Sequence, residues 1–294
     1  METDNSAAAL AAVVEATVAA DVNGRGTAHL MVPGDLLAAA AELATAERVA
    51  IVTGFFIPGA CAAETDGPPG ALFLARALIR LGKEAVVLTD RWCRPVLDHP
   101  AMAPWVHGVP VIAVAPRPGD DWCRRHGITH LVSVERPGRA ADGHYYSARG
   151  VVLDDCVAPL DGWFLERPPG VVTVGIGDGG NEIGMGKVLA QVRRHVPLGE
   201  RIGSVVPADY VIAAGVSNWG AYALLALLAH LTRADLLPAP AEEAALVEAL
   251  AAAGAVDGLS GRNVPAVDGQ SLADLQEMLR RLHRETTAAA RQVS

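Results

Sequence analysis

The stretch VVTVGIGDGGNEIGMGKV, residues 171–188, has the pattern of a buried strand followed by a glycine-rich turn and a helix. Its first residues are mostly β-branched and apolar. Gly175, Gly177 and Gly180 then have the G-x-G-x-x-G spacing of a dinucleotide-binding turn, and Gly179 lies between them. A unit of this kind is typical of parallel α/β sheets. The stretch therefore predicts a Rossmann-like fold with a binding site at the glycine turn.

Further apolar runs of the same kind alternate with helical patterns along the chain. The expected strands are 48–54, 84–90, 109–116, 129–136, 171–177 and 209–215. The expected helices are 70–82, 185–196, 219–232, 239–254 and about 272–284. Near-continuous apolar strands separated by helices indicate a parallel sheet that is covered on both faces. We therefore predict a doubly wound, mainly parallel α/β fold.

The domain organisation follows from the same pattern. We predict a single α/β domain over residues 1–294, with an N-terminal helical segment (1–46), a core (47–270) and a C-terminal helix (271–294). The stretch near 135–170 has no clear periodicity, and loops of that length are uncommon in compact domains unless they have a function. We expect an inserted loop or hairpin there.

Composition limits the classes of function. Of the 294 residues, 51% are hydrophobic and 19% charged, which excludes disorder as the dominant state, and the net charge of -9 disfavours nucleic acid and anionic membranes as partners. The apolar run 221–231 is shorter than the roughly 20 residues that span a bilayer. Four scattered cysteines and an acidic N-terminus favour a cytoplasmic protein. We expect a small-molecule ligand, and a homo-oligomer stays open.

The glycine turn also carries two carboxylates, Asp178 and Glu182, with Asn181 between them. A helix N-terminus favours an anion by about 0.3–1 kcal/mol. Two like charges about 4 Å apart near a protein surface repel by about 4 kcal/mol, so Asp178 disfavours a phosphate in this turn. The pair suits a divalent cation or an ammonium group instead. Helix capping is the structural alternative, but it does not explain the crowding of glycines.

Polar residues follow the other expected strands as well. Because the carboxyl ends of parallel strands meet at one edge, where ligands bind, we expect these side chains to converge. They are Glu64, Thr65, Asp66, Asp90, Glu135, Arg136, Asp178, Asn181, Glu182, Ser217 and Asn218, joined by Asp257 and Arg262 if their segment forms a last turn. The cluster 136–149, which includes Tyr146, offers arginines and hydroxyls for a carboxylate, with solvated loop charges as the alternative. The long connection 55–70 is a candidate pocket wall.

Five ordered motifs resemble one known family. They are IVTGFFIP, AETDGPPGALFLARAL, ERPGRAADGHYY, GIGDGGNEIGMGKV and AVDGLSGR, spread from about residue 25 to about residue 270. Together they resemble the D-glutamate cyclase-like C-terminal domain family, which forms the second half of an animal mitochondrial D-glutamate cyclase and occurs as a stand-alone microbial protein. The resemblance implies a cyclising hydro-lyase that converts D-glutamate, or a related amino-dicarboxylate, to 5-oxo-D-proline or the reverse.

The chemistry of this reaction suggests roles for the motif residues and for the polar residues at the strand ends. A carboxylate accepts the ammonium proton, an arginine orients the α-carboxylate, and a divalent ion, Mn²⁺ or Mg²⁺, polarises the γ-carboxylate. The expected catalytic residues are Asp178, Glu182 and Asp66, and the expected metal ligands are Asp66, Asp178 and Asp257. The expected substrate-binding residues are Glu64, Arg136, Tyr146, Asn181, Ser217, Asn218 and Arg262.

Two other functions stay open at this point. The first is a nucleotide- or dinucleotide-binding enzyme on the same fold, and the second is a non-catalytic ligand-binding partner of a separate hydro-lyase.

Overall fold

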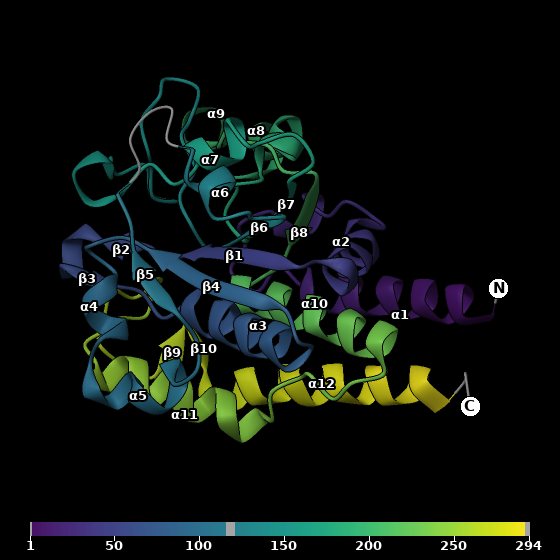
Figure 1. Cartoon of the computed structure of the whole chain (residues 1–294). Helices are drawn as coiled ribbons and strands as arrows, with labels where there is room; N and C mark the ends of the chain where they lie inside the picture. Colours follow the sequence, from purple (N-terminus) through teal and green to yellow (C-terminus); the bar gives the residue numbers. More distant parts are fainter. Residues whose placement is uncertain (1, 116–120, 292–294) are drawn as a thin grey trace.

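The centre of the molecule is a six-stranded parallel sheet (Figure 1). The computed structural model describes residues 2–115 and 121–291. The strands are β1 (Arg48–Thr53), β4 (Glu84–Thr89), β5 (Val111–Ala113), β6 (His130–Val134), β7 (Val172–Gly177) and β8 (Tyr210–Ala213). All six predicted strands are therefore confirmed, although residue 116, the end of the expected strand 109–116, lies outside the described residues.

The strand order is β5-β4-β1-β6-β7-β8, and every neighbouring pair is parallel. The chain builds outward from β1 to β5, returns to place β6 beside β1, and then builds outward in the other direction. In a sheet of this kind the point of reversal, here between β1 and β6, opens a crevice at the carboxyl ends of the strands. The predicted doubly wound fold is confirmed.

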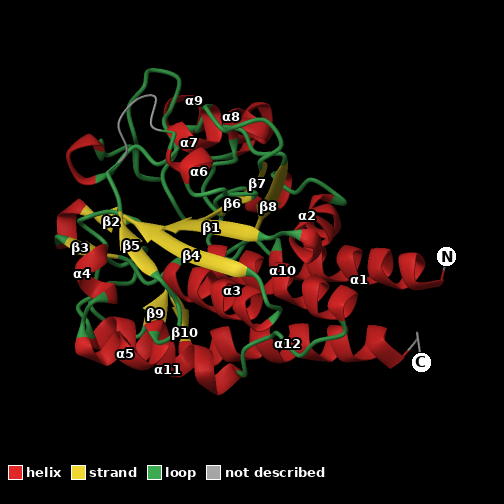
Figure 2. Cartoon of the chain, viewed as in Figure 1, coloured by secondary structure: helices red, strands yellow, loops and turns green. Residues whose placement is uncertain are grey.

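The two faces of the sheet are covered by different layers (Figure 2). Long helices cover one face: α3 (Pro68–Arg80) and α10 (Ser217–Thr232) pack on it. Behind and beside them lie α1 (Glu2–Val18), α2 (Asp35–Thr45), α11 (Pro240–Ala252) and α12 (Leu272–Arg291). We call this the helical layer. The other face is covered by loops and the short helices α6 (Trp122–Arg125), α7 (Gly162–Leu165), α8 (Leu189–His195) and α9 (Gly199–Ile202).

The strands alternate between these two layers because successive side chains of a strand point to opposite faces. Val49 and Ile51 of β1 belong to the apolar cluster of the helical layer. Ala50 and Val52 of the same strand pack with Trp163 of α7 on the other side. The remaining helices, α4 (Arg94–Leu97) and α5 (Ala103–Val106), lie in the connection between β4 and β5.

The helix after the glycine turn begins later than the sequence pattern predicts. Residues 186–188 form a 3-10 turn, and α8 starts only at Leu189. The preceding loop is held by other parts of the chain, since Ile183 N–H donates to Arg136 O and Gly184 N–H donates to Val206 O. Glu182 is therefore not in the first turn of a helix, and the expected helix dipole does not act on it.

Three connections border the carboxyl edge of the sheet. The insertion after β6 contains a hairpin in which Ser147 N–H donates to Val151 O, followed by α7, as expected for 135–170. The connection after β1 forms a small hairpin of β2 (Phe56–Ile57) and β3 (Ala62–Ala63). A third hairpin, β9 (Ala266–Val267) and β10 (Gln270–Ser271), precedes α12.

The N-terminal helices are packed onto the rest of the fold. Helices α1 and α2 both contact α10, and the described ends of α1 and α12 lie on the same side of the molecule (Figure 1). The division of residues 1–294 into a single domain stays a prediction, and positions 1 and 292–294 lie outside the described part. Within the described part, the helices are all too short or too polar to cross a membrane.

Candidate active site

A cavity of about 350 Å³ lies at the carboxyl ends of β1, β6 and β7. Its wall comes from the α1–α2 connection at 23–25, the β2–β3 hairpin, the hairpin at 147–151, the loop 178–182 and the segment 258–268. The expectation that the long connection after β1 forms a pocket wall is thus met, because Phe55, Ile57 and Glu64 line the cavity. The cavity occupies the edge where this class of sheet binds ligands.

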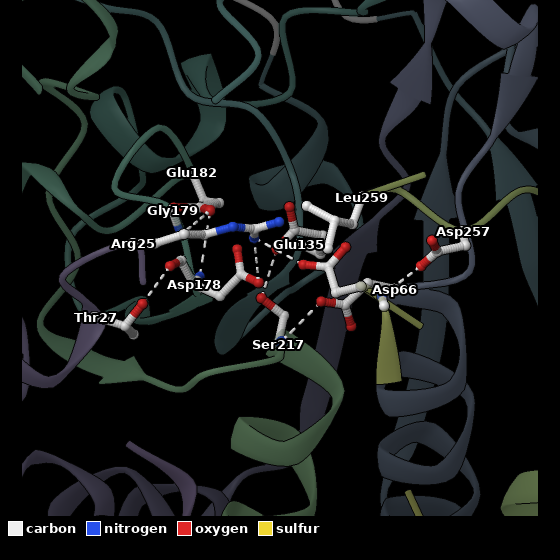
Figure 3. A network of polar contacts seen from close by, with 12 residues as sticks. Arg25, Thr27, Asp66, Glu135, Asp178, Gly179, Glu182, Ser217, Asp257 and Leu259 are labelled. Carbon is white, nitrogen blue, oxygen red and sulfur yellow. Dashed lines mark hydrogen bonds and ion pairs between the residues drawn. The ribbon is translucent and has the colours of Figure 1, made fainter. Parts of the chain in front are cut away.

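Six buried carboxyl groups form a cluster at this edge of the sheet, and Figure 3 shows Arg25 with four of them, Asp66, Glu135, Asp178 and Glu182. The six are Glu64, Asp66, Glu135, Asp178, Glu182 and Asp268, each at most 6% exposed. Arg25 Nη1 lies 2.6 Å from Asp178 Oδ2 and 2.7 Å from Asp268 Oδ2. Since one guanidinium cannot neutralise six carboxylates, protons or further cations must balance this cluster.

The environment shifts the pKa of every member of the cluster. Burial raises the pKa of Asp66 to about 7, helped by the charge of Asp268. Burial also raises the pKa of Asp178 to about 7, although Arg25 opposes the shift. For Glu64, Glu135 and Asp268, burial and neighbouring carboxylates raise the pKa well above the usual range.

The pKa values of Glu182 and Arg25 are each set by two effects that oppose one another. Burial raises the pKa of Glu182, while backbone N–H donors, that of Gly179 foremost, partly counteract it. Burial alone would lower the pKa of Arg25, but the carboxylates around it, Asp178 foremost, outweigh that effect and raise it. Arg25 therefore stays charged, while Asp66 and Asp178, whose pKa values are about 7, gain and lose protons near neutral pH. Groups that gain and lose protons near neutral pH are suited to acid–base catalysis.

The glycines of the turn make room for the protein's own atoms. A Cβ on Gly177 would lie 2.7 Å from Glu182 Oε2, and one on Gly175 would lie 2.6 Å from the Gly184 backbone. Glu182 Oε1 accepts hydrogen bonds from the N–H groups of Asp178 (3.2 Å) and Gly179 (2.6 Å). The crowding of glycines therefore has a physical reason other than the close approach of a phosphate. The turn is folded around the carboxylate of Glu182.

Asp66 and Ser217 link the cluster to the helical layer. The Asp66 carboxylate accepts the backbone N–H groups of Ser217 (2.8 Å) and Asn218 (2.9 Å), which are the first residues of α10. Ser217 Oγ donates to Glu135 Oε2 at 2.5 Å. Asn218 Oδ1 accepts from the N–H groups of Gly67 and Gly70 at the start of α3. These three side chains thus fix two helix N-termini against the site, and Asn218 has its amide oxygen occupied in doing so.

Two predicted substrate-binding arginines lie elsewhere. Arg136 is fully buried, and its guanidinium binds Asp90 at 2.6 Å together with the carbonyl oxygens of Gly54 and Ala158. Arg136 links the segments that carry Gly54, Asp90 and Ala158, and it does not line the cavity where a substrate carboxylate would bind. Arg262 is exposed and does not line the cavity. The arginines that do line it are Arg25 and Arg149.

Two other predicted residues have supporting positions. Tyr146 does not line the cavity: its hydroxyl donates to Asp142 and its carbonyl accepts from Asn181 Nδ2 at 2.8 Å. Asp257 accepts the N–H groups of Ser260 (2.9 Å) and Gly269 (2.7 Å), so it shapes the turn that carries Leu259.

The predicted metal-ligand set Asp66, Asp178 and Asp257 does not come together. Within the described residues, two groups of three carboxylates have oxygen atoms within 4.8 Å of one another: Asp66 with Asp178 and Asp268, and Glu135 with Asp178 and Glu182. Asp257 belongs to neither group because its carboxylate points to the backbone of its own turn. Asp178 is common to both.

Sequence reasoning gave no role to three residues of the site, Arg25, Glu135 and Asp268. The sequence held one signal for Asp268: the tetrapeptide AVDG occurs twice, at 255–258 and 266–269, and the second copy carries Asp268. Glu135 was expected at the sheet edge, but without a chemical role. In the structure both residues have a left-handed backbone, with φ of 46° for Glu135 and 50° for Asp268. Non-glycine residues in this region are uncommon and cluster at functional sites. For Arg25 no such local signal exists.

Fold and cavity together define an α/β protein of Rossmann-like topology with an acidic site at the carboxyl ends of its strands. Residues 14–283 match the family described as D-glutamate cyclase-like, C-terminal, and the chain belongs to this family. It is 39% identical over 235 residues to the human mitochondrial D-glutamate cyclase, a match that covers 73% of this chain and 38% of that protein. The chain thus spans less than half the length of this relative.

Solved structures with partial similarity include exonuclease RecJ bound to manganese, with a TM-score of 0.37 at 16% identity, covering 88% of this chain and 67% of that one. RecJ from Thermus thermophilus in complex with Mn²⁺ has a TM-score of 0.35 at 15% identity, covering 96% and 42%.

Proposed function

We propose that this chain is a cyclising hydro-lyase that interconverts D-glutamate, or a related amino-dicarboxylate, and 5-oxo-D-proline in the cavity above β6 and β7. Family membership and the relative named D-glutamate cyclase support the reaction class. The observation that carries the proposal is the Asp178–Arg25 pair at the cavity wall, because it sets a proton-exchanging carboxyl group beside a fixed positive charge.

The reaction requires a balanced transfer of protons. The α-ammonium group of glutamate must lose a proton before its nitrogen can attack the γ-carbon. The C–N bond then forms, one C–O bond breaks, and of the three ammonium protons one stays on the lactam nitrogen while two leave with the oxygen as water. Asp178 is suited to accept a proton from the amine and return it to the departing oxygen, because burial raises its pKa to about 7. The reverse reaction uses the same groups.

Glu182 and Asp66 have supporting roles in this proposal. Glu182 lines the cavity next to Asp178 and is a second proton acceptor. Asp66 does not line the cavity, but its oxygen atoms approach those of Asp178 and it is anchored by the N-terminus of α10. We propose that it maintains the charge balance of Asp178.

The two carboxylates of the substrate need positive partners. Arg25 and Arg149 are the arginines of the cavity wall, and Arg149 is held by a hydrogen bond to the Leu259 carbonyl. Arginine binds carboxylates in a planar, bidentate manner and so fixes their orientation. A divalent ion such as Mn²⁺ or Mg²⁺, held by carboxylates of the cluster, would polarise the γ-carboxylate and stabilise the negative charge that develops there.

Turnover of purified protein tests the proposal. D-glutamate and, separately, 5-oxo-D-proline are incubated with the full chain with and without Mn²⁺, and products are resolved by chiral chromatography, with L-glutamate as control. We expect interconversion of the D-compounds. Tight binding of D-glutamate without turnover would contradict the proposal in favour of a ligand-binding protein. Binding of NAD with its diphosphate at Gly177 would favour the dinucleotide alternative.

We further propose that the protein acts in the cytoplasm. All four of its cysteines, Cys61, Cys93, Cys123 and Cys156, are free thiols, and three of them are buried. Free buried thiols fit a reducing compartment. Cell fractionation of a tagged full-length chain tests this location. We expect the tag in the cytoplasmic fraction, and its recovery elsewhere would contradict the proposal.

A further inference from the structure

One carboxylate oxygen of the cavity has no partner. Glu182 is 1% exposed and lines the cavity, and its Oε2 accepts no hydrogen bond from any described residue. Its Oε1 is held by two backbone N–H groups, so the orientation of the carboxylate is fixed. Leaving a buried charged acceptor unsatisfied costs about 1–3 kcal/mol or more. A cation at Oε2 removes this cost.

The neighbours of Glu182 complete a set of ligands. Oxygen atoms of Glu135, Asp178 and Glu182 lie within 4.8 Å of one another, and all three residues line the cavity. Six oxygen atoms around Mg²⁺ or Mn²⁺, each about 2.1 Å from the ion, are ~3 to ~4 Å apart, so a small adjustment brings three carboxylates onto one ion. Carboxylate oxygens are the ligands that such hard cations prefer.

The second group of carboxylates already has its partners. Asp178 and Asp268 share Arg25, and both oxygen atoms of Asp66 accept backbone N–H groups from Gly67, Ser217 and Asn218. The positive charge for this group therefore comes from the chain itself. The two groups differ, because among the described residues only the group with Glu182 contains a fully buried carboxylate oxygen without a hydrogen-bond partner.

The turn is also built to keep this carboxylate in place. A Cβ on Gly177 would come within 2.7 Å of Glu182 Oε2, and one on Gly179 would come within 3.0 Å of Glu182 Oε1. Glu135 is fixed from the opposite side by the hydroxyl of Ser217 and by its left-handed backbone. Pre-set ligands lower the cost of ordering a metal site.

We propose that Glu135, Asp178 and Glu182 form a divalent-cation site, while Arg25 serves as the built-in cation of Asp178 and Asp268. The site differs from the set Asp66, Asp178 and Asp257 that the sequence suggested. The chemical role of the ion, to polarise a substrate carboxylate, rests on the proposed function, but its binding does not.

Calorimetric titration of the full chain with Mn²⁺, after dialysis against EDTA and without substrate, tests the site. We expect one Mn²⁺ per chain. Glu182→Gln keeps the Oε1 acceptor and replaces Oε2 with an amide, so it should weaken Mn²⁺ binding about tenfold or more while the melting temperature stays within a few degrees. Asp66→Asn makes the same change of charge in the other group and should weaken binding clearly less.

Three results would overturn the site: absence of Mn²⁺ binding to the wild-type chain at millimolar concentration, unchanged affinity in Glu182→Gln, or an equal or larger loss in Asp66→Asn. If Glu182→Gln does not fold, Glu135→Gln replaces it with the same expectation. Turnover that persists in EDTA, without Mn²⁺ binding, would refute the site and leave the proposed function standing. Mn²⁺ binding without turnover of either D-compound would support the site and refute the proposed function.

Discussion

The helical layer and the carboxyl edge of the sheet are both buried, but for opposite physical reasons. In α10, Leu224, Leu225, Leu227 and Leu228 are fully buried among apolar neighbours, and each such side chain stabilises the fold by about 1.5–3 kcal/mol. At the edge, six carboxyl groups are at most 6% exposed, and burial of a carboxylate is unfavourable unless it is paired, as Asp178 is with Arg25. The helical layer thus supplies the stability that offsets a costly, chemically useful edge.

The largest effect is expected for Asp178→Asn. The substitution keeps the shape of the side chain but removes its ability to exchange a proton, so we expect turnover of D-glutamate to fall about 10²- to 10⁴-fold. The melting temperature should stay the same or rise, because a buried like charge is removed from the cluster. Steady-state kinetics and thermal unfolding measure the two quantities. Wild-type turnover in this variant would remove Asp178 from the mechanism.

The converse pattern is expected for Leu225→Ala in the helical layer. Leu225 is fully buried, so the cavity left behind should lower the free energy of unfolding by about 2–5 kcal/mol. Turnover of the folded protein should remain within about twofold, since the residue is remote from the carboxyl edge. Leu231→Ala is the matched control on the same helix, because Leu231 is 38% exposed. If Leu225→Ala lost much of its turnover per folded molecule, stability and turnover would not reside in separate regions of the molecule.

Gly177→Ala tests the packing at the border between the two regions. Its Cβ would lie 2.7 Å from Glu182 Oε2 and 2.8 Å from Met185 Cε, which predicts a loss of about 1–3 kcal/mol in the free energy of unfolding. Gly59→Ala serves as control, because a Cβ there meets nothing within 4 Å. Urea denaturation of both variants gives the difference, and equal stability would mean that the turn relaxes freely.

The smallest effect concerns Glu243, an acid of the helical layer that is fully buried. Burial raises the pKa of Glu243 on α11 to about 8, although the nearby Tyr222 hydroxyl lowers it. Between about pH 4.5 and pH 8 the folded chain keeps this proton while the unfolded chain releases it, so stability falls as the pH rises through this window. Glu243→Gln should make the fall shallower. Glu248→Gln, an exposed acid on the same helix, should leave the slope unchanged, and equal slopes in both variants would contradict the assignment.

The sheet could be predicted because its signal is local. Each strand is a short apolar run followed by polar residues, and all six runs form strands in the structure. The main departure is β5, which covers only Val111–Ala113 of the expected 109–116; it lies at the sheet edge directly after Pro110, which cannot donate to a ladder. The late start of α8 was not predictable, because it depends on the Gly184 backbone passing close to Gly175 and pairing with Val206.

The site was predictable only in part, because its pairings are distant in sequence. The rule that strand ends converge correctly gathered Glu64, Asp66, Glu135, Asp178 and Glu182. The same rule brought Asp90 and Arg136 together, but they neutralise each other, and no spacing in the sequence distinguishes a structural ion pair from a substrate clamp. Arg25 precedes Asp178 by 153 residues and comes from a connection without periodicity, so nothing local marks it.

The position of Arg25 ahead of β1 makes the amino-terminal segment part of the candidate site. A protease that trims the chain between Arg25 and Arg48 would spare every strand of the sheet yet strip the acids of their built-in counter-ion. The same cut would also remove α1, whose apolar side chains pack on α10, so the candidate site and the helical layer depend on one segment. A minimal fragment for engineering or fusion must therefore begin upstream of this arginine.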